Sequence, residues 1–324
     1  MKPWSRVVLA LSFIFAAAPQ SWAAPPAWAE RPVRLIVPSA AGGSGDTLAR
    51  PLAEALGSEI GQTVVVENKG GVGGVLGASM VANSSPADNQ LLFGAVHHMI
   101  APAVLKNFPY DTRKDLKAVT LIAAMPNVLV VNANSPYHSV EDLLAAAKQG
   151  AGVNYGTSGV ATMLHLMAGK LEKKSGTTMT AVHYKGSGPA VMALISGDQV
   201  DFMFETMPSA VAQIRNGRLR ALAVSSPERA PALPDVPTLK ELDMDEISAQ
   251  TWYGIFMQGD VPDATVQSVA DSIHRALNTD KIKEIWEGNG ATLVTNSPAE
   301  FTVYVDQQLN YWADSVSDLG LSNF

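Results

Sequence analysis

The residues of this chain that could do chemistry are small loop residues rather than nucleophiles beside a base. The apolar segment Arg31–Val37 runs into Pro38–Asp46, a loop of Ser, Ala and Gly. Apolar residues at helical spacing follow it: Leu48, Leu52, Leu56 and Ile60. This order predicts a strand, a loop and a helix. Because the first N–H groups of such a helix lack backbone acceptors and lie at the positive end of its dipole, the loop is predicted to bind an anion without a basic side chain.

Three more loops have the same construction, each between an apolar segment and a predicted helix. They are Tyr155–Gly159, Tyr184–Ala190 and Phe204–Ser209. Thr162 lies near the start of the helix after the first, and Pro189 and Pro208 fit the first helical positions after the others. Ligands of open α/β sheets bind at the carboxyl ends of strands. Since glycine admits close approach of N–H groups and hydroxyls add donors, the four loops predict one shared anion site.

The charged residues of these loops indicate a small carboxylate rather than a phosphodiester polymer. Lys185 is the only cation in them, and it either faces the ligand or is an exposed turn lysine. Asp46 either caps its helix or accepts N–H groups of the loop, or an ordered water, and holds the loop's shape. Glu205 has the same alternatives, and could instead face a ligand hydroxyl or ammonium.

Bulky residues follow another predicted strand, Leu91–Gly94. His97, His98 and Met99 would narrow and flatten a cleft, unless the two histidines are ordinary, partly exposed loop residues. Trp252 and Tyr253 are candidates for the cleft or a hinge, with core packing favoured for Trp252.

Motifs of common enzymes and metal sites are missing. The sequence lacks G-x-S-x-G, H-E-x-x-H, Walker A and S-x-x-K, and it has no cysteine. Both glycine clusters miss the third glycine of G-x-G-x-x-G, where Leu48 and Leu76 stand. The six histidines show no metal-ligand pairing at helical spacing. We therefore expect no catalytic residue, no cofactor and no metal.

The first 29 residues predict an export signal. Lys2 and Arg6 precede Val7–Ala18, an apolar run too short to cross a bilayer, and small-x-small patterns predict cleavage after Ala23 or Ala29. The net charge is −7 for the 324 residues, and removing the leader's two cations makes it near −9. This acidity argues against nucleic acid or an anionic membrane as partner.

Strands and helices alternate along the chain, which predicts an α/β fold with mostly parallel strands. Predicted strands are 33–37, 64–67, 91–94, 118–123, 127–131, 153–155, 181–183, 201–204, 219–224 and 253–257. Predicted helices are 46–60, 73–83, 140–148, 161–175, 189–196, 207–216, 264–278, 281–287 and 299–318. Pro51 lies one turn into its helix, so that helix should start later or bend. Without a linker between halves, a second domain should be inserted, with crossings near Pro126–Asn132 and Ser248–Thr251.

Together these motifs resemble the Bug family, the periplasmic solute-binding proteins of tripartite tricarboxylate transporters. The resemblance covers the mature chain in order: Pro38-x-x-x-Gly-Gly-x-x-Asp46, Val65–Asn68 with Gly70–Gly77, Tyr155–Gly159, Tyr184–Ala190, Phe204-Glu-x-x-Pro-Ser209, Leu219–Val224 and Pro231–Thr238. It implies a two-lobed periplasmic-binding-protein (Venus flytrap) fold, each lobe a mostly parallel sheet flanked by helices. After the signal, 1–29, lobe 1 would comprise 30–131 and 249–324, and lobe 2 would comprise 132–248.

The resemblance also implies a role and a site. The protein would work in the periplasm, bind a small carboxylate and deliver it to the cognate membrane permease, without catalysis. A monomer is expected by default, since nothing in the sequence points to oligomerisation. The expected ligand-binding residues are Ser39, Ala40, Ala41, Gly42, Gly43, Asp46, His97, His98, Thr157, Ser158, Gly159, Thr162, Gly186, Ser187, Gly188, Pro189, Ala190 and Glu205. Rival hypotheses are a secreted hydrolase or isomerase that uses Asp46, Glu205 or a histidine as base, and a sensor that reports the ligand to a membrane receptor.

Three departures from the family pattern bear on the ligand. Ala40–Ala41 replace Pro or aromatic residues and Gly, His97–Met99 replace small Ser or Thr residues, and Glu205 stands where Asp is more common. A ring could stack on a histidine against Met99 or Met163. We therefore expect an aromatic dicarboxylate such as terephthalate, with aliphatic acids such as citrate, malate or glutamate as the alternative.

Overall fold

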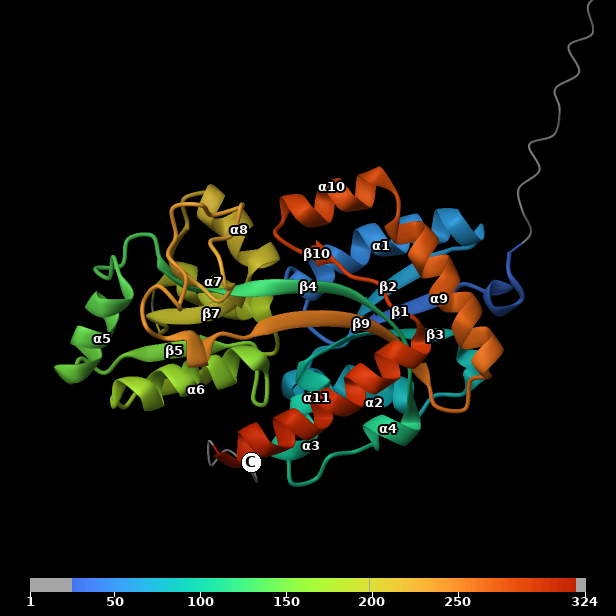
Figure 1. The fold of residues 1–324 in the computed structure, drawn as a ribbon, viewed down its shortest axis with the longest axis horizontal. Coiled ribbons are helices and arrows are strands. Elements are labelled where there is room, and N and C mark those ends of the chain that lie inside the picture. The colour runs from blue at the N-terminus through green and yellow to red at the C-terminus, as the bar shows by residue number, and fades with distance from the viewer. Residues whose placement is uncertain (1–24, 198, 319–324) are drawn as a thin grey trace, which may run out of the picture.

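The computed structural model describes residues 25–197 and 199–318, so the predicted signal peptide lies largely outside the described residues. Figure 1 shows two groups of strands and helices side by side along the longest axis, joined by two long strands. The last residues of the predicted signal form a short 3-10 helix, η1 (Ala27–Ala29), in which Ala29 is fully buried. No helix among the described residues is both long and apolar enough to cross a membrane.

Lobe 1 is built on three parallel strands in the order β2-β1-β3, whose bounds are β1 (Val33–Val37), β2 (Val64–Asn68) and β3 (Gln90–Ala95). β9 (Gln250–Gln258) pairs antiparallel with β3, and β10 (Thr292–Leu293) pairs with β4. Its helices are α1 (Ser44–Ile60), α2 (Val75–Ala82), α3 (His97–Val104), α4 (Thr112–Asp115), α9 (Asp263–Leu277), α10 (Asp280–Gly288) and α11 (Pro298–Asp318).

Lobe 2 repeats this plan with β5 (Asn154–Thr157), which pairs in parallel with β6 (Thr180–His183) and β7 (Phe202–Thr206). β8 (Leu219–Val224) joins the sheet beside β4. Its helices are α5 (Val140–Lys148), α6 (Met163–Ser175), α7 (Ser187–Ser196) and α8 (Met207–Arg215). A parallel strand triplet in each lobe places the strand carboxyl ends, and the loops that follow them, at the junction between the lobes.

β4 (Leu116–Asn132) passes from one lobe to the other, as Figure 1 shows. Its first part, through Pro126, pairs antiparallel with β9, and from Asn127 it pairs antiparallel with β7 and β8. The sequence predicted two strands here, 118–123 and 127–131. The two predicted strands form one continuous strand, because Pro126 is still paired with Gln250 of β9 where the pairing changes from β9 to β7 and β8. The mostly parallel sheets expected are therefore mixed, with antiparallel β4 and β9 linking two parallel triplets.

Buried polar bonds fasten the two connecting strands where the pairing changes. Asn127 donates to the Ala249 carbonyl at 2.8 Å and accepts from the Thr251 hydroxyl at 2.8 Å. The Ser225 hydroxyl accepts the Asn127 N–H at 2.8 Å and donates to Ala249 at 2.7 Å. These residues coincide with the two crossings predicted from sequence, so the boundaries 30–131, 132–248 and 249–324 remain our proposal for the lobes.

Several elements differ from the sequence prediction, and α4 and β10 had no predicted counterpart. α1 starts at Ser44, two residues earlier than predicted, and continues through Pro51, which excludes the later start, one of the two alternatives for this helix. α3 was expected to be a loop. Its apolar residues Val96, Ile100 and Val104 follow helical spacing, and they pack one face into the core.

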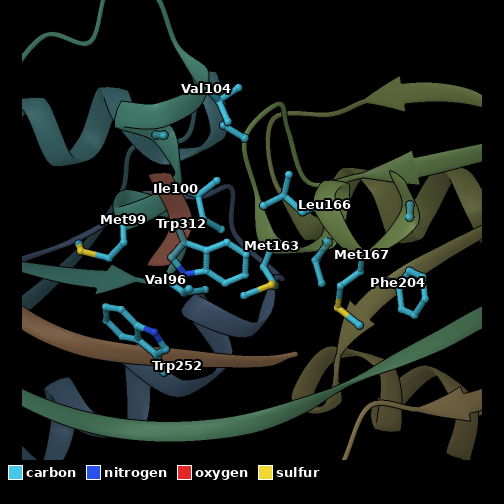
Figure 2. Packing of buried hydrophobic residues seen from close by; sticks show 14 of the residues in the cluster. Val96, Met99, Ile100, Val104, Met163, Leu166, Met167, Phe204, Trp252 and Trp312 are labelled. Carbon is cyan, nitrogen blue, oxygen red and sulfur yellow. The ribbon is translucent and has the colours of Figure 1, made fainter. Parts of the chain in front are cut away.

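Three apolar clusters hold the molecule together. One lies in lobe 1 between α1, α9 and the sheet, and a second lies in lobe 2 under α7 and α8. The third spans both lobes, and Figure 2 shows part of it: Ile100 and Val104 of α3, with Val96 at its N-cap, face Met163 and Leu166 of α6, and Trp312 of α11 lies among them. Apolar contact between the lobes is therefore part of this closed arrangement.

Candidate carboxylate-binding site

A cavity of about 50 Å³ lies between the lobes, at the carboxyl ends of strands from both. Most of its lining is small or polar: Pro38, Ser39, Gly43, Ser44, Gly45, Gly71, Gly73, Gly74, Ser158, Thr162, Gly186, Ser187, Thr206 and Thr251. The larger lining residues are Val37, Phe93, Val96, His97, Met163, Leu164, Lys185 and Tyr253. A volume this small holds only a few water molecules. A dicarboxylate is larger than this, so its binding requires the side chains of the cavity wall to adjust.

Six helices of the described chain begin at this cavity. The N-cap or first residue of each lines it: Gly43 and Ser44 for α1, Gly74 for α2, Val96 and His97 for α3, Thr162 and Met163 for α6, Gly186 and Ser187 for α7, and Thr206 for α8. Each helix start brings unpaired N–H groups and the positive end of a dipole. Three come from each lobe, so an anion held here would be stabilised from both sides.

Five of these six helices have N–H donors that no capping side chain uses. α1, α2, α3, α7 and α8 have no side-chain hydrogen bond at the N-cap. α6 differs because Thr162 accepts the His165 N–H at 3.3 Å. Away from the cavity, α5 has a complete capping box from Ser139 and Asp142. The first N–H groups of α2 already bond the Gly71 and Val72 carbonyls of the preceding turn, so the donors offered to a ligand come from the other uncapped helices.

The cavity wall carries little charge of its own. Burial, with a smaller contribution from His98, lowers the pKa of His97 well below its usual value, so His97 is neutral at neutral pH. Burial raises the pKa of Tyr253, which therefore keeps its proton. Lys185 is the one cation among the lining residues. Oriented N–H dipoles and hydroxyls, rather than ion pairs, are thus the groups that this cavity offers to an anion.

The lobes touch through glycine backbones on either side of the cavity. A Cβ built on Gly188 of lobe 2 would lie 2.5 Å from the Ala41 carbonyl oxygen of lobe 1. A Cβ on Gly73 would lie 2.3 Å from the Val160 carbonyl oxygen. Ser44 of lobe 1 also hydrogen-bonds Thr206 of lobe 2 through their hydroxyls. The closed arrangement thus depends on the absence of a side chain at Gly73 and Gly188. We call this contact between the lobes, formed by Gly73 with Val160 and Gly188 with Ala41, the glycine seam.

The structure brings seven of the predicted site residues to the cavity wall. They are Ser39, Gly43, His97, Ser158, Thr162, Gly186 and Ser187. The others lie close in sequence but outside the lining: Ala40, Ala41, Gly42, Asp46, His98, Thr157, Gly159, Gly188, Pro189, Ala190 and Glu205. Ala41 and Gly188 meet at the seam instead. Thr157 shapes its loop, because its hydroxyl bonds His183 Nδ1 at 2.7 Å and accepts the Gly159 N–H at 3.2 Å.

The two histidines have different surroundings. The structure contradicts the prediction that His97, His98 and Met99 form a loop of the cleft, because these residues begin helix α3. His97 lines the cavity, whereas His98 and Met99 are buried in the core at 0% and 1% exposure. His98 Nδ1 accepts the Ala95 N–H at 3.0 Å. The correction follows from the helix, since consecutive residues of α3 point to different faces. Helical spacing of the apolar residues from Val96 to Val104 was the signal that could have revealed this.

Sequence reasoning missed several cavity residues. Gly71, Gly73 and Gly74 belong to the glycine-rich stretch quoted for the family resemblance, yet they were not assigned to the site. Thr251 lies on β9, more than 200 residues from the first loop, and only the sheet pairing β3-β9-β4 brings it there. Its neighbour Tyr253, a sequence-based candidate for the cleft or a hinge, lines the cavity as well. Trp252 packs in the core at 3% exposure, as favoured from sequence.

Asp46 holds the first loop in place. Its carboxylate accepts the Gly42 N–H at 3.0 Å and pairs with Arg50 at 2.8 Å, the second of the sequence-based alternatives. Burial alone would raise its pKa, but hydrogen bonds from Arg50 and the Gly42 N–H bring the pKa of Asp46 below its usual value.

We expect Asp46→Asn to destabilise the protein by about 1 kcal/mol at pH 7. The neutral amide loses the ion pair with Arg50 and accepts the Gly42 N–H more weakly, while the Arg50 side chain remains solvent-exposed. Since the folded pKa of Asp46 is lowered, its contribution is present above the unfolded value and is lost as the pH falls through the folded one. Denaturant unfolding at pH 7 and pH 3 measures both. A difference between wild type and variant that is as large at pH 3 would contradict this role.

Two α/β lobes, joined by crossing strands around a cavity rich in helix N-termini, define a two-lobed solute-binding protein. Residues 48–321 match the model of the TctC family, described as the tripartite tricarboxylate transporter family receptor. The chain belongs to this family, which confirms the resemblance found in its motifs, and its fold is that of periplasmic binding proteins.

Individual relatives agree with this assignment. Protein BugT of Bordetella pertussis is 33% identical over 293 residues, which cover 90% of each chain. The structure of periplasmic binding protein BugD superposes with a TM-score of 0.88 at 30% identity, covering 91% of this chain and 99% of that one. MatC of Rhodopseudomonas palustris with bound malate has a TM-score of 0.84 at 28% identity, covering 88% and 99%. Rpa4515 of R. palustris with adipate has 0.85 at 28%, covering 92% and 100%.

Proposed function

We propose that this protein captures a small carboxylate in the periplasm and delivers it to a tripartite tricarboxylate-type membrane permease. The observation that carries the proposal is the cavity at which six helices begin, five of them without a side-chain cap. Malate and adipate in the two similar structures are both dicarboxylates. The ligand would bridge the lobes and stabilise the closed state by its higher affinity for that state.

Within this class we propose an aromatic dicarboxylate such as terephthalate, with an aliphatic diacid as the alternative. Phe93, His97 and Tyr253 bring three rings to the cavity, and Met163 adds a flexible apolar side chain. Rings of a ligand and a protein pack favourably edge-to-face or offset. The aliphatic alternative is supported by the malate and adipate of the similar structures.

Titration of the purified protein with terephthalate, adipate, malate and glutamate by calorimetry tests this proposal. Micromolar or tighter binding of terephthalate alone supports the aromatic ligand. Binding of an aliphatic acid alone supports the carboxylate-binding role and rejects terephthalate. If none of the four binds, the proposed site chemistry is wrong.

His97→Ala should weaken terephthalate binding about two- to tenfold, because an aromatic contact of about 0.5–1.5 kcal/mol is lost. Binding of an aliphatic diacid should change less, because no ring contact is involved. His98→Ala is the matched neighbour. It should lower the melting temperature, since the side chain is buried, while a folded sample keeps its affinity. Equal loss of terephthalate affinity in both variants would count against the ring contact.

Catalysis by Asp46 or Glu205 has less support. Both lie outside the cavity lining, and Asp46 is engaged by Gly42 and Arg50. The family is a family of receptors. Incubation of the protein with a tightly bound carboxylate, followed by chromatography, tests the enzyme hypothesis directly. Release of a new product would support it against the binding role.

A further inference from the structure

We propose that ligand capture by this protein is linked to proton uptake through Glu205, whose carboxyl group is protonated in the ligand-bound closed form. The proposal rests on the function proposed above and narrows its ligand to carboxylic acids without an ammonium group. It assigns Glu205 as a positioning residue, because it acts on the ligand through the hydroxyls in front of it.

The surroundings of Glu205 satisfy only one of its two oxygens. The residue ends β7, and its exposure is 0%. Oε1 accepts the Thr206 N–H at 2.9 Å and the Thr206 hydroxyl at 3.0 Å. Oε2 is buried without a hydrogen-bond partner among the described residues. An ionised carboxylate would leave a charged oxygen unpaired in the interior, whereas a protonated one keeps a neutral O–H there.

Glu205 lies directly behind the cavity wall. Thr206 lines the cavity and, since its own hydroxyl proton goes to Glu205, it accepts the proton of Ser44 from the opposite lobe. The hydroxyl of Ser187, also a lining residue, lies near the carboxyl group without hydrogen-bond geometry. A chain of hydroxyls therefore connects Glu205 to the cavity and across the lobe junction.

No described cation lies within ion-pair distance of Glu205. The polar groups near it are the hydroxyls of Thr206 at the end of β7, Ser187 of α7 and Ser209 of α8, and Tyr253 of β9 interacts with it electrostatically. On the neighbouring strand β4, the residue paired with Glu205 is Val128, which is apolar. α6 packs against β7 and carries the buried His165, whose pKa burial lowers to about 4, so it is neutral as well. Further ionisable groups near the cavity are Asp46 of α1, paired with Arg50, neutral His97 of α3, and Lys185 before α7.

Burial raises the pKa of Glu205, and the nearby hydroxyls of Ser209 and Ser187, with the hydrogen bonds from Thr206, offset part of that rise. A carboxylate in the adjacent cavity adds negative charge to this poorly solvated site, so it favours the protonated form further. By linkage, protonated Glu205 favours the bound carboxylate. A ligand ammonium would need the ionised form and direct access, and Thr206 and Ser187 line the cavity in front of Glu205 instead.

Calorimetric titration of the whole protein with terephthalate and with adipate, at pH 6, 7 and 8 in two buffers of different ionisation enthalpy, measures the protons taken up. We expect uptake that approaches one proton per ligand as the pH rises. Affinity should then fall, by up to about tenfold per pH unit above the pKa of Glu205 in the free protein. Glu205→Gln should bind as tightly as wild type at pH 6 and lose the pH dependence, because the amide keeps the shape and stays neutral.

Glu67→Gln is the matched control, since Glu67 is a partly exposed carboxylate paired with Arg34 at 2.6 Å in the same structure. It should keep the wild-type proton uptake. Binding without proton uptake, or a Glu205→Gln variant with the wild-type pH dependence, would overturn the proposal.

A second readout needs no ligand and so separates this proposal from the proposed function. Because the folded pKa of Glu205 is raised, its folded carboxyl keeps a proton that the unfolded chain loses, and stability falls as the pH rises above the unfolded value of about 4.3. The melting temperature of Glu205→Gln relative to wild type should therefore increase between pH 4.5 and pH 8. A difference that does not change with pH would refute the buried protonated state, whether or not a carboxylate binds.

Discussion

Gly188→Ala should weaken carboxylate binding about five- to 150-fold while the protein stays folded. The added Cβ would lie 2.5 Å from the Ala41 carbonyl oxygen of the other lobe, so the closed form must open to admit it. Overpacking of this kind costs about 1–3 kcal/mol, and here that cost falls on the closed state. Gly188 has ordinary helical geometry near the start of α7, so alanine itself is tolerated there.

Gly169→Ala is the matched control, because nothing lies within 4 Å of its Cβ position on α6. Replacing a mid-helix glycine by alanine should raise stability by up to about 1 kcal/mol and leave affinity unchanged. Calorimetry measures affinity, and small-angle scattering of the liganded samples measures closure. If Gly188→Ala binds as tightly as wild type and closes equally, the glycine seam is not what the closed form requires.

Trp312→Ala should destabilise the protein by about 3–5 kcal/mol, the range for removing a large buried ring. Trp312 is 3% exposed, and its Nε1 donates to Gln308 at 3.1 Å. Gln308 also accepts from Trp252 at 3.2 Å, which ties α11 to β9. Figure 2 shows Trp312 among Ile100 of α3 and Met163 of α6, so the loss should also weaken contact between the lobes.

Val303→Ala on the same helix is the control, because that side chain is 57% exposed and should change stability by less than about 0.5 kcal/mol. Chemical denaturation of both variants, with and without ligand, gives the two free energies. A loss below about 1 kcal/mol for Trp312→Ala would show that α11 contributes little to joining the lobes.

Local patterns were enough to predict most elements of this fold. Alternation of apolar runs and amphipathic segments predicted β1, α5 and β8 at their observed bounds. Small loop residues before helices predicted the anion site, because helix N-termini follow from local geometry alone. The α3 error has a local cause too. The two histidines, His97 and His98, were interpreted as loop residues of the cleft, although the helical spacing of Val96, Ile100 and Val104 predicts a helix.

The remaining features depend on contacts between distant segments. Tyr253 and Thr251 reach the cavity only because β9 lies between β3 and β4, and no residue near them signals that pairing. The glycines at the seam matter because they have no side chain. Gly188 and Ala41 meet across the lobes, and only the closed arrangement shows that a methyl group would not fit. Glu205 was expected among the ligand-binding residues, with a loop-shaping role as an alternative, yet Thr206 and Ser187 line the cavity in its place.

The central claim is that uncapped helix N-termini of both lobes recognise carboxylate charge. The most direct test is calorimetric titration with two matched pairs, terephthalate against terephthalamide and adipate against adipamide, which share shape but differ in charge. We predict micromolar or tighter binding of at least one diacid and no measurable binding of its diamide. Equal affinity for a diacid and its diamide would contradict recognition of the charge and leave shape alone as the basis of binding.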